Sequence, residues 1–390
     1  MSEKEKILIL FHGEHIAYSP TVIQLYDMLS GKYDVTITAE HPITFNNQKP
    51  GNRKVLYHRH YHVKGRHFYL FLFYLALLFS KEARYFKQNK ISYKEYFFRF
   101  LFIKRLLRKN KYKRIISVDT MNGLFCSILK VPTDFLSLEL CVDEQYFPLI
   151  DPVYINCVII QSKERYEYLF KERKSKTYFV QNAPAFHEIQ IKSKRNGLIY
   201  AGSAYSLLGF YHCLNYIRKY KDEKLTVQGA ISSPDRDRVD REYNELLEEN
   251  RLIINSNYLE NDQMVEYISN FEIGFCFYNF EETVISSNYF NYISAPSGKM
   301  FKYLAAGVPV VCSDILGFKF VNEFQCGVTI DRMGEDEIRA AILKIRANYD
   351  FYVNNALKAA KHYDFDAAIA PYLDSIDTQT GVKTGQYHEI

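Results

Sequence analysis

The chain has 390 residues, of which 47% are hydrophobic and 24% charged, with a formal net charge of +5, and this predicts a globular protein large enough for two domains. Its seven cysteines are scattered without a CxxC pair, which argues against a disulfide framework or a cysteine-ligated zinc site. The longest uncharged apolar run, residues 67–80, is shorter than the roughly 18 residues of a spanning helix, and the charged N-terminus does not resemble a signal peptide. We therefore expect a cytoplasmic protein.

The first half alternates short apolar runs with amphipathic helices. A strand at 7–11 precedes a polar loop that starts with His12, and a helix at 20–29 leads to a strand at 33–38. Strand, turn, helix, strand is the opening of a doubly wound α/β domain, in which ligands bind at the carboxyl ends of the strands. Further strands are predicted at 114–118, 135–138, 156–161 and 177–180.

Residues 61–114 are basic and rich in aromatic side chains, with fifteen Lys or Arg against two acids. Helices that are apolar on one face and basic on the other are typical of an anionic membrane surface. Core helices of a Rossmann-like domain with basic outer faces fit the pattern equally well. The bulky aliphatic residues among the charges argue against nucleic acid as a partner.

The second half repeats the alternation of strands and helices. Its predicted strands lie at 197–200, 224–227, 252–255, 272–278, 308–312 and 327–330. A polar stretch at 188–196 separates the halves, so we expect residues 1–187 to form the first domain and residues 188–365 the second. We expect a helix at 366–377 to pack back on the first domain. Residues 378–390 have no apolar pattern, and we expect a disordered tail.

Residues 295–314 combine signals for an anion site late in the second half. Pro296 and Ser297 predict the start of a helix, with Ser297 as the cap, and Gly307 and Pro309 predict its end. Gly298 and Lys299 would then lie at the positive N-terminal end of this helix, which suits a phosphate or diphosphate. The stretch is not a Walker A loop. An ordinary capped helix with a surface lysine remains the alternative.

The segment PSGKMFKYLAAGVPVV, residues 296–311, resembles a motif of family 4 glycosyltransferases of the GT-B type. Weaker similarities are YAG (200–202), QG (228–229), NY (257–258), SLEL (137–140), IIQSKER (159–165) and VQNAP (180–184). The resemblance implies two Rossmann-like domains that face a central cleft and transfer of a sugar, hexosyltransferase-like, from a nucleotide-sugar donor. It implies no bound metal and no cofactor.

The resemblance also implies a donor site in the second domain. Ser297, Gly298 and Lys299 would hold the donor diphosphate, and Lys302 is a possible second counter-charge. The other donor-site residues would be Gly202 and Ser203 beside the phosphates, Tyr258 at the base, Asn288 in the loop facing the sugar, and Gln228.

Two departures from the family pattern lie in the same segment. Relatives carry two glutamates eight positions apart, and this chain has Ser294 and Lys302 there. A lysine cannot accept hydrogen bonds from ribose hydroxyls, so we expect ribose recognition or the donor itself to differ.

A general base for the acceptor hydroxyl is sought at the strand ends of the first domain. Glu139 and Asp119 are the leading pair because each follows an apolar strand, and His12 is a third candidate. Alternatively, each of these three side chains has no catalytic role and only solvates the end of a strand. His58, His60 and His62 alternate along the chain, and we interpret them as a polar strand face rather than a metal site.

The sequence therefore predicts a metal-independent glycosyltransferase that acts on a glycan or lipid-linked acceptor, in bacterial surface polysaccharide synthesis, at the inner face of the membrane. Two alternatives stay open. One is a GT-B-fold sugar-nucleotide epimerase or hydrolase, and the other is a non-catalytic glycosyltransferase-like subunit.

Overall fold

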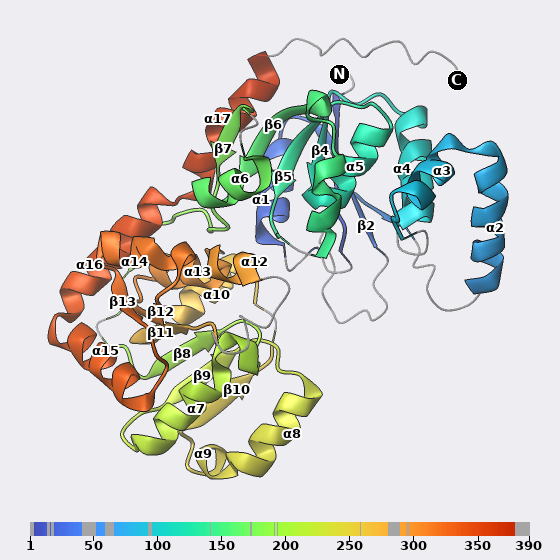
Figure 1. Cartoon of the computed structure of the whole chain (residues 1–390). Coiled ribbons are helices and arrows are strands. Elements are labelled where there is room, and N and C mark those ends of the chain that lie inside the picture. Colours follow the sequence, from blue (N-terminus) through green and yellow to red (C-terminus); the bar gives the residue numbers. More distant parts are fainter. Residues whose placement is uncertain are drawn as a thin grey trace. The chain divides into compact units, whose positions relative to one another are not determined.

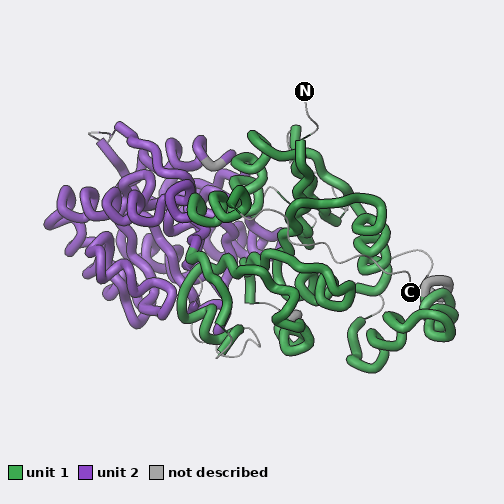
Figure 2. Tube along the Cα trace, turned by 90° about the horizontal axis from the view of Figure 1, so that it is seen from above, with its two compact units in different colours: residues 1–179, 369–390 green, residues 180–368 purple. Residues whose placement is uncertain are grey.

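The computed structural model describes residues 4–13, 16, 19–40, 52–58, 66–92, 96–140, 142–171, 174–190, 192, 194–257, 259–279, 289–294 and 296–378. The chain forms two compact units, coloured separately in Figure 2: Met1–Phe179 with Ile369–Ile390 is unit 1, and Val180–Ala368 is unit 2. The predicted boundary after residue 187 thus lies inside unit 2. Ala183 is buried in the core of that unit, and the Phe186 N–H donates a hydrogen bond to Asp364.

Unit 1 is built on a seven-stranded sheet with the order β3-β2-β1-β4-β5-β6-β7, in which every described pairing is parallel (Figure 1). Residues on both faces of the central strands are buried, as expected for a sheet covered by helices on both sides. The strands are β1 (Lys6–Leu10), β2 (Asp34–Glu40), β3 (Val55–His58), β4 (Arg114–Val118), β5 (Thr133–Ser137), β6 (Ile155–Ile160) and β7 (Thr177–Phe179).

Helices lie between most of the consecutive strands of this sheet. They are α1 (Pro20–Ser30), α2 (Arg66–Phe79), α3 (Lys81–Gln88), α4 (Phe98–Lys109), α5 (Asp119–Ile128) and α6 (Lys163–Phe170), with 3₁₀ turns at Val142–Leu149 and Pro152–Tyr154. Figure 1 shows α2 at the periphery of unit 1, beyond α3 and α4 as seen from the sheet.

Unit 2 contains a six-stranded parallel sheet with the order β10-β9-β8-β11-β12-β13. The strands are β8 (Leu198–Ala201), β9 (Leu225–Gln228), β10 (Leu252–Asn255), β11 (Ile273–Cys276), β12 (Val310–Ser313) and β13 (Gly327–Ile330). Successive residues of β8 belong to different cores, Tyr200 to one face of the sheet and Ile199 to the other, so both faces are covered.

The helices of unit 2 are distributed over these two faces. They are α7 (Phe210–Lys219), α8 (Ser233–Glu242), α9 (Asn244–Glu248), α10 (Asn261–Ile268), α12 (Tyr289–Ser294), α13 (Gly298–Ala305), α14 (Lys319–Phe324), α15 (Glu335–Ala347) and α16 (Tyr349–His362), with 3₁₀ turns at Ser206–Leu208 and Leu316–Phe318. The two sheets with helices on both faces confirm the predicted pair of doubly wound α/β domains.

The last described helix, α17 (Phe365–Thr378), belongs to unit 1 from Ile369 onwards. The Tyr372 hydroxyl donates a hydrogen bond to Asp134 at 2.9 Å, and Lys32 forms an ion pair with Asp377 at 2.6 Å. The predicted disordered tail lies outside the described residues except for Thr378. No helix among the described residues has the length and apolar character needed to cross a membrane.

The strand order of each sheet reverses direction at one point, between β1 and β4 in unit 1 and between β8 and β11 in unit 2. Open α/β sheets bind ligands outside the carboxyl ends of their strands at such a switch point. The loops that follow Leu10, Val118, Ala201 and Cys276 are therefore the places where each unit is expected to bind a ligand.

Candidate functional site

The N-terminus of α13 lies where the sequence predicts it, but it is not capped as expected. Ser297 occupies the capping position, yet its side chain makes no capping hydrogen bond, so that prediction is wrong. Its hydroxyl interacts with the buried Cys276 thiol instead. A Cβ at Gly298 would lie 2.7 Å from the Asn182 side-chain nitrogen, so a larger residue would fit there only if that side chain moved.

Lys299 extends from α13 over the end of β8. Its Nζ lies 4.3 Å from the centroid of the Tyr200 ring and is shut off from solvent. No described residue forms a hydrogen bond to this Nζ. Burial lowers the pKa of the Lys299 ammonium, while the nearby Cys276 and Cys213 raise it. The ammonium therefore lies in a buried environment that penalises its charge unless an anion accompanies it.

Gly202 provides room beside this lysine. It has a φ of +96°, and a Cβ there would touch only the Lys299 side chain, at 3.8 Å. Gly229, at the end of β9, packs so closely that a Cβ would overlap the Gly202 carbonyl. The backbone at the end of β8 is therefore held in a conformation that suits glycine and leaves its outer side open to a ligand.

Other predicted donor residues differ in their surroundings. Ser203 is exposed next to Gly202, and its carbonyl accepts a hydrogen bond from the Tyr200 hydroxyl at 3.1 Å. Gln228 is fully buried, and its Nε2 donates to the Asn257 carbonyl at 2.7 Å, so it holds the following loop. Tyr258 and Asn288 lie outside the described residues.

The two positions that depart from the family pattern are both largely enclosed. Ser294 is buried, and its hydroxyl donates a hydrogen bond to the Phe290 carbonyl at 2.6 Å within α12. Lys302 follows Lys299 by three residues on α13, and burial lowers its pKa to about 8. Two lysines with lowered pKa values thus lie on one short helix.

Tyr303 fixes α13 on the sheet, a role that the sequence analysis missed. Its hydroxyl accepts a hydrogen bond from the Ala201 N–H at 2.6 Å and lies 3.0 Å from the Phe275 carbonyl. Its ring fills the space above Gly274, where a Cβ would come within 2.7 Å of it. A glycine inside the apolar strand 272–278 is the sequence signal for such a close approach.

Unit 1 brings Asp119 and Glu139 together at the ends of β4 and β5. Asp119 has a φ of +59°, and its Oδ1 accepts hydrogen bonds from the Leu138 N–H at 2.7 Å and the Glu139 N–H at 3.1 Å. A non-glycine residue in the left-handed region is uncommon and is often found at functional sites.

The Asp119 carboxyl has a shifted pKa. Burial raises this pKa to about 7, and the Glu139 carboxylate adds to the increase, whereas the two backbone donors and Arg165 lower it. Arg165, another residue that the sequence analysis missed, is buried and donates to the Leu138 carbonyl at 3.0 Å. A carboxyl that titrates near neutral pH is suited to acid–base chemistry.

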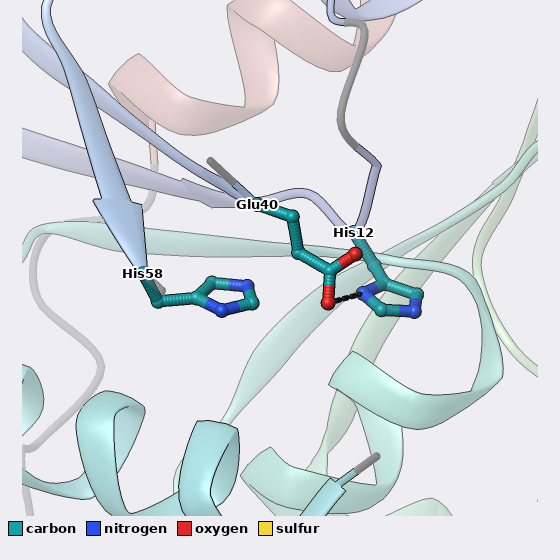
Figure 3. Close-up of side chains that lie close together, drawn as sticks. All are labelled: His12, Glu40 and His58. Carbon is teal, nitrogen blue, oxygen red and sulfur yellow. Dashed lines mark ion pairs between the residues drawn. The ribbon is translucent and has the colours of Figure 1, made fainter. Parts of the chain in front are cut away.

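His12, the third predicted base, lies beside Glu40 at the end of β2. Its Nδ1 is 3.7 Å from the Glu40 Oε1, and its ring packs edge-on against Tyr96. His58 ends β3 beside Glu40, so the three side chains form a cluster (Figure 3). The sequence pattern predicts His58 on a polar strand face, whereas the structure shows that its side chain is buried.

No protein-family model and no curated protein matches the chain. Solved structures match it over nearly its whole length. Sucrose-phosphate synthase from Thermosynechococcus elongatus has 13% identity and a TM-score of 0.60, covering 96% of this chain and 98% of that one. Anabaena HepE, in complex with UDP and glucose, has 10% identity and a TM-score of 0.62, covering 96% and 100%.

A third similar structure, described as a putative UDP-N-acetylglucosamine 2-epimerase from Listeria monocytogenes, has 13% identity and a TM-score of 0.55, covering 98% of each chain. At these identities the likeness concerns the fold. Together with the two parallel sheets, it shows that the chain has the GT-B fold, and the structures that share this fold include glycosyltransferases.

Proposed function

We propose that the chain is a glycosyltransferase that moves a sugar from a nucleotide-sugar donor to a glycan or lipid-linked acceptor. The observation that carries this proposal is the Lys299 ammonium, which is buried over the Tyr200 ring and donates no hydrogen bond to any described residue. A buried ammonium is costly unless an anion pairs with it, and a diphosphate is the anion that a nucleotide-sugar brings.

The surroundings of Lys299 support a diphosphate in particular. The Ser297 side chain makes no capping hydrogen bond at the α13 N-terminus, so its hydroxyl does not occupy the first N–H groups, and the helix dipole favours negative charge there. Gly202 leaves room for the phosphates beside Lys299. In the reaction, these N–H groups, Lys299 and Lys302 stabilise the charge that develops on the leaving diphosphate, without a metal ion.

Asp119 is our candidate for the general base that accepts the proton of the acceptor hydroxyl. Its pKa of about 7 makes it a stronger base than an ordinary aspartate while leaving it ionised in part at neutral pH. Glu139 contributes negative charge next to it. His12 remains a predicted base, and its imidazole lies beside the Glu40 carboxylate.

The donor identity rests on similarity and chemistry. HepE is described in complex with UDP, so a UDP-sugar is the first donor to test. The segment 296–311 supports a placement near family 4, and the cellular role that we propose is bacterial surface polysaccharide synthesis in the cytoplasm. Lys302 in place of an acid predicts that the ribose is held differently from relatives.

We further propose that unit 1 docks on an anionic membrane surface, where a lipid-linked acceptor would be found. Five large apolar side chains of α2 are at least 42% exposed, including Leu78 at 66% and Phe79 at 82%. Beside them lies a groove of about 670 Å³, lined by Phe79, Leu101, Lys81, Arg84, Lys104, Arg105, Arg108, Lys109, Glu82 and Ser80. Apolar side chains next to a basic groove match the interface of an anionic bilayer.

Most of the cations in this groove have no ion-pair partner among the described residues. Lys104 forms an ion pair with Glu82 at 2.5 Å, and hydrogen bonds from Lys104 and Ser80 lower the pKa of Glu82 to about 2 although burial raises it. The other five cations of the groove form no ion pair with a described residue. Lipid headgroups would supply the missing negative charge.

A sugar-nucleotide epimerase or hydrolase is the second candidate function, favoured by the similarity to the structure described as an epimerase. Incubation of the purified protein with donor alone distinguishes the two. An epimerase or hydrolase converts the donor without an acceptor, whereas a transferase needs the acceptor for turnover. A non-catalytic subunit would do neither.

Thermal unfolding in the presence of UDP, GDP, CMP and their sugars tests the proposal as a whole. A nucleotide that binds only the folded protein raises the melting temperature, by an amount that grows with its concentration. We expect UDP and UDP-sugars to give the largest shift. If none of these nucleotides shifts the melting temperature, the proposed donor site is wrong.

A further inference from the structure

Three potential metal ligands lie at the carboxyl edge of the sheet in unit 1. Glu40 is the last residue of β2, His58 is the last residue of β3, and His12 follows β1 by two residues. These strands are parallel neighbours, and the register pairs Glu40 with His58, so their ends meet at one edge. Each side chain offers one ligand atom, and these three atoms lie within 4.8 Å of one another.

We propose that His12, Glu40 and His58 bind a divalent transition-metal ion, with Zn²⁺ as the best match. Two imidazole nitrogens and one carboxylate oxygen form a donor set that suits Zn²⁺ and similar ions, whereas Mg²⁺ and Ca²⁺ prefer oxygen ligands. Three protein ligands leave at least one coordination position for water or a hydroxyl group.

The distances are compatible with this role after small side-chain movements. Ligand atoms around a tetrahedral zinc ion lie roughly 3.4 Å apart, given metal–ligand distances of about 2.1 Å. His12 Nδ1 and Glu40 Oε1 are already 3.7 Å apart. Figure 3 shows the Glu40 carboxylate between the two imidazole rings, so rotations of the side chains bring all three ligand atoms around one point.

Exposure differs among the three ligands in a way that suits an accessible ion. His58 is buried, with 4% of its surface exposed. The side chains of His12 and Glu40 are 33% and 14% exposed. An ion can therefore reach the cluster from the side of His12. The cluster lies in unit 1, whereas the proposed donor site lies in unit 2, and this inference does not depend on the proposed function.

Calorimetric titration of the full chain with ZnCl₂ tests the site, with MgCl₂ as the comparison. We expect one Zn²⁺ per chain and no heat from Mg²⁺. Loss of an outer-shell partner of a metal site already costs 10–100-fold in affinity, so we expect Glu40→Gln and His58→Gln each to weaken Zn²⁺ binding by about 100-fold. His187→Gln, which changes an exposed histidine of unit 2, should bind as the wild type does.

Circular dichroism and the melting temperature without metal show whether each variant is folded, and Glu40→Gln keeps the proposal testable if the buried His58→Gln variant does not fold. With Co²⁺ as the probe, we expect a ligand-field absorption band in the wild type that is lost in Glu40→Gln. Two results would overturn the proposal. One is the absence of Zn²⁺ binding, which would leave only the ion pair between His12 and Glu40. The other is equal binding by wild type and Glu40→Gln, which would place the ion elsewhere.

Discussion

The Nζ of Lys299 lies 4.3 Å from the centroid of the Tyr200 ring, so that a residue at the start of α13 reaches a side chain that belongs to the opposite face of the sheet. The lysine crosses the carboxyl end of β8 next to Gly202. A cation–π contact compensates part of the cost of burying the ammonium. We infer that the remainder is offset when an anion binds.

Lys299→Met should leave the ligand-free protein as stable as the wild type or more stable by about 1 kcal/mol, because it replaces a buried unpaired ammonium by an apolar side chain of similar length. Urea unfolding measures this difference. Lys344→Met, at an exposed position of α15, is the matched control and should have no effect. A loss of more than about 1 kcal/mol in Lys299→Met would indicate that the ammonium is satisfied in the free protein.

Lys299→Met should also change how the free energy of unfolding depends on pH. The Lys299 pKa in the folded protein is below the ordinary value of 10.5, so the unfolded chain binds more protons between the two values. The free energy of unfolding of the wild type therefore increases as the pH rises from the folded-state pKa of Lys299 to 10.5. Lys299→Met lacks this increase. Unfolding at several alkaline pH values compares the two slopes.

Asp119→Asn should reduce turnover roughly 100-fold or more, as expected for loss of a general base. With a pKa of about 7, Asp119 is protonated at low pH, so the wild-type rate should rise with pH through about 7. The asparagine variant should lose this rise. Glu139→Gln is the companion variant: because the Glu139 carboxylate raises the Asp119 pKa, its removal should move the rise to lower pH.

A pH–rate profile of the three proteins provides the measurement. If Asp119→Asn retains both the rate and the rise near pH 7, another group acts as the base, and His12 would be the next candidate.

Tyr303→Phe should destabilise the protein by about 1 to 3 kcal/mol, because it leaves the buried Ala201 N–H and Phe275 carbonyl without the hydroxyl. The loss appears as a lower midpoint in urea unfolding. Tyr267→Phe, at a partly buried tyrosine of α10, is the control. Equal midpoints for both variants would show that the hydroxyl does not anchor α13.

Arg105→Gln combined with Arg108→Gln should weaken binding to vesicles that contain anionic lipid by roughly tenfold or more, since each basic residue near such a surface contributes about 1 kcal/mol. Phe79→Ser should also weaken binding, through the loss of an 82% exposed apolar side chain. Sedimentation with vesicles at low salt measures both effects, with Lys344→Gln and purely zwitterionic vesicles as controls. Wild-type binding that is indifferent to lipid charge would exclude the proposed surface.

Much of the fold was predictable because its signals are local. Short apolar runs followed by glycine or polar residues predicted the strands of both sheets except β3, and Gly307 and Pro309 predicted the end of α13. The predicted domain boundary after residue 187 is later than the start of unit 2 at Val180. The sequence pattern assigns the turn at 181–184 to the first domain, but Ala183 is buried in the core of unit 2.

The candidate site was predictable only in part. The position of Lys299 at a helix N-terminus followed from the sequence, and so did Asp119 and Glu139 at strand ends. The capping role of Ser297 was wrong, because the local pattern does not show that Cys276 lies beside its hydroxyl. Tyr303, Arg165 and the cluster of His12, Glu40 and His58 depend on contacts between residues distant in the chain, which periodicity does not reveal.

The central claim, that Lys299 binds the diphosphate of a nucleotide-sugar, is tested most directly by calorimetric titration of UDP into the wild type, Lys299→Met and Lys344→Met. Hydrogen bonds to charged groups contribute about 1.5 to 3 kcal/mol, so we predict that Lys299→Met weakens UDP binding by about 10- to 150-fold while Lys344→Met binds as the wild type does. Equal affinity of all three folded proteins for UDP would contradict the claim.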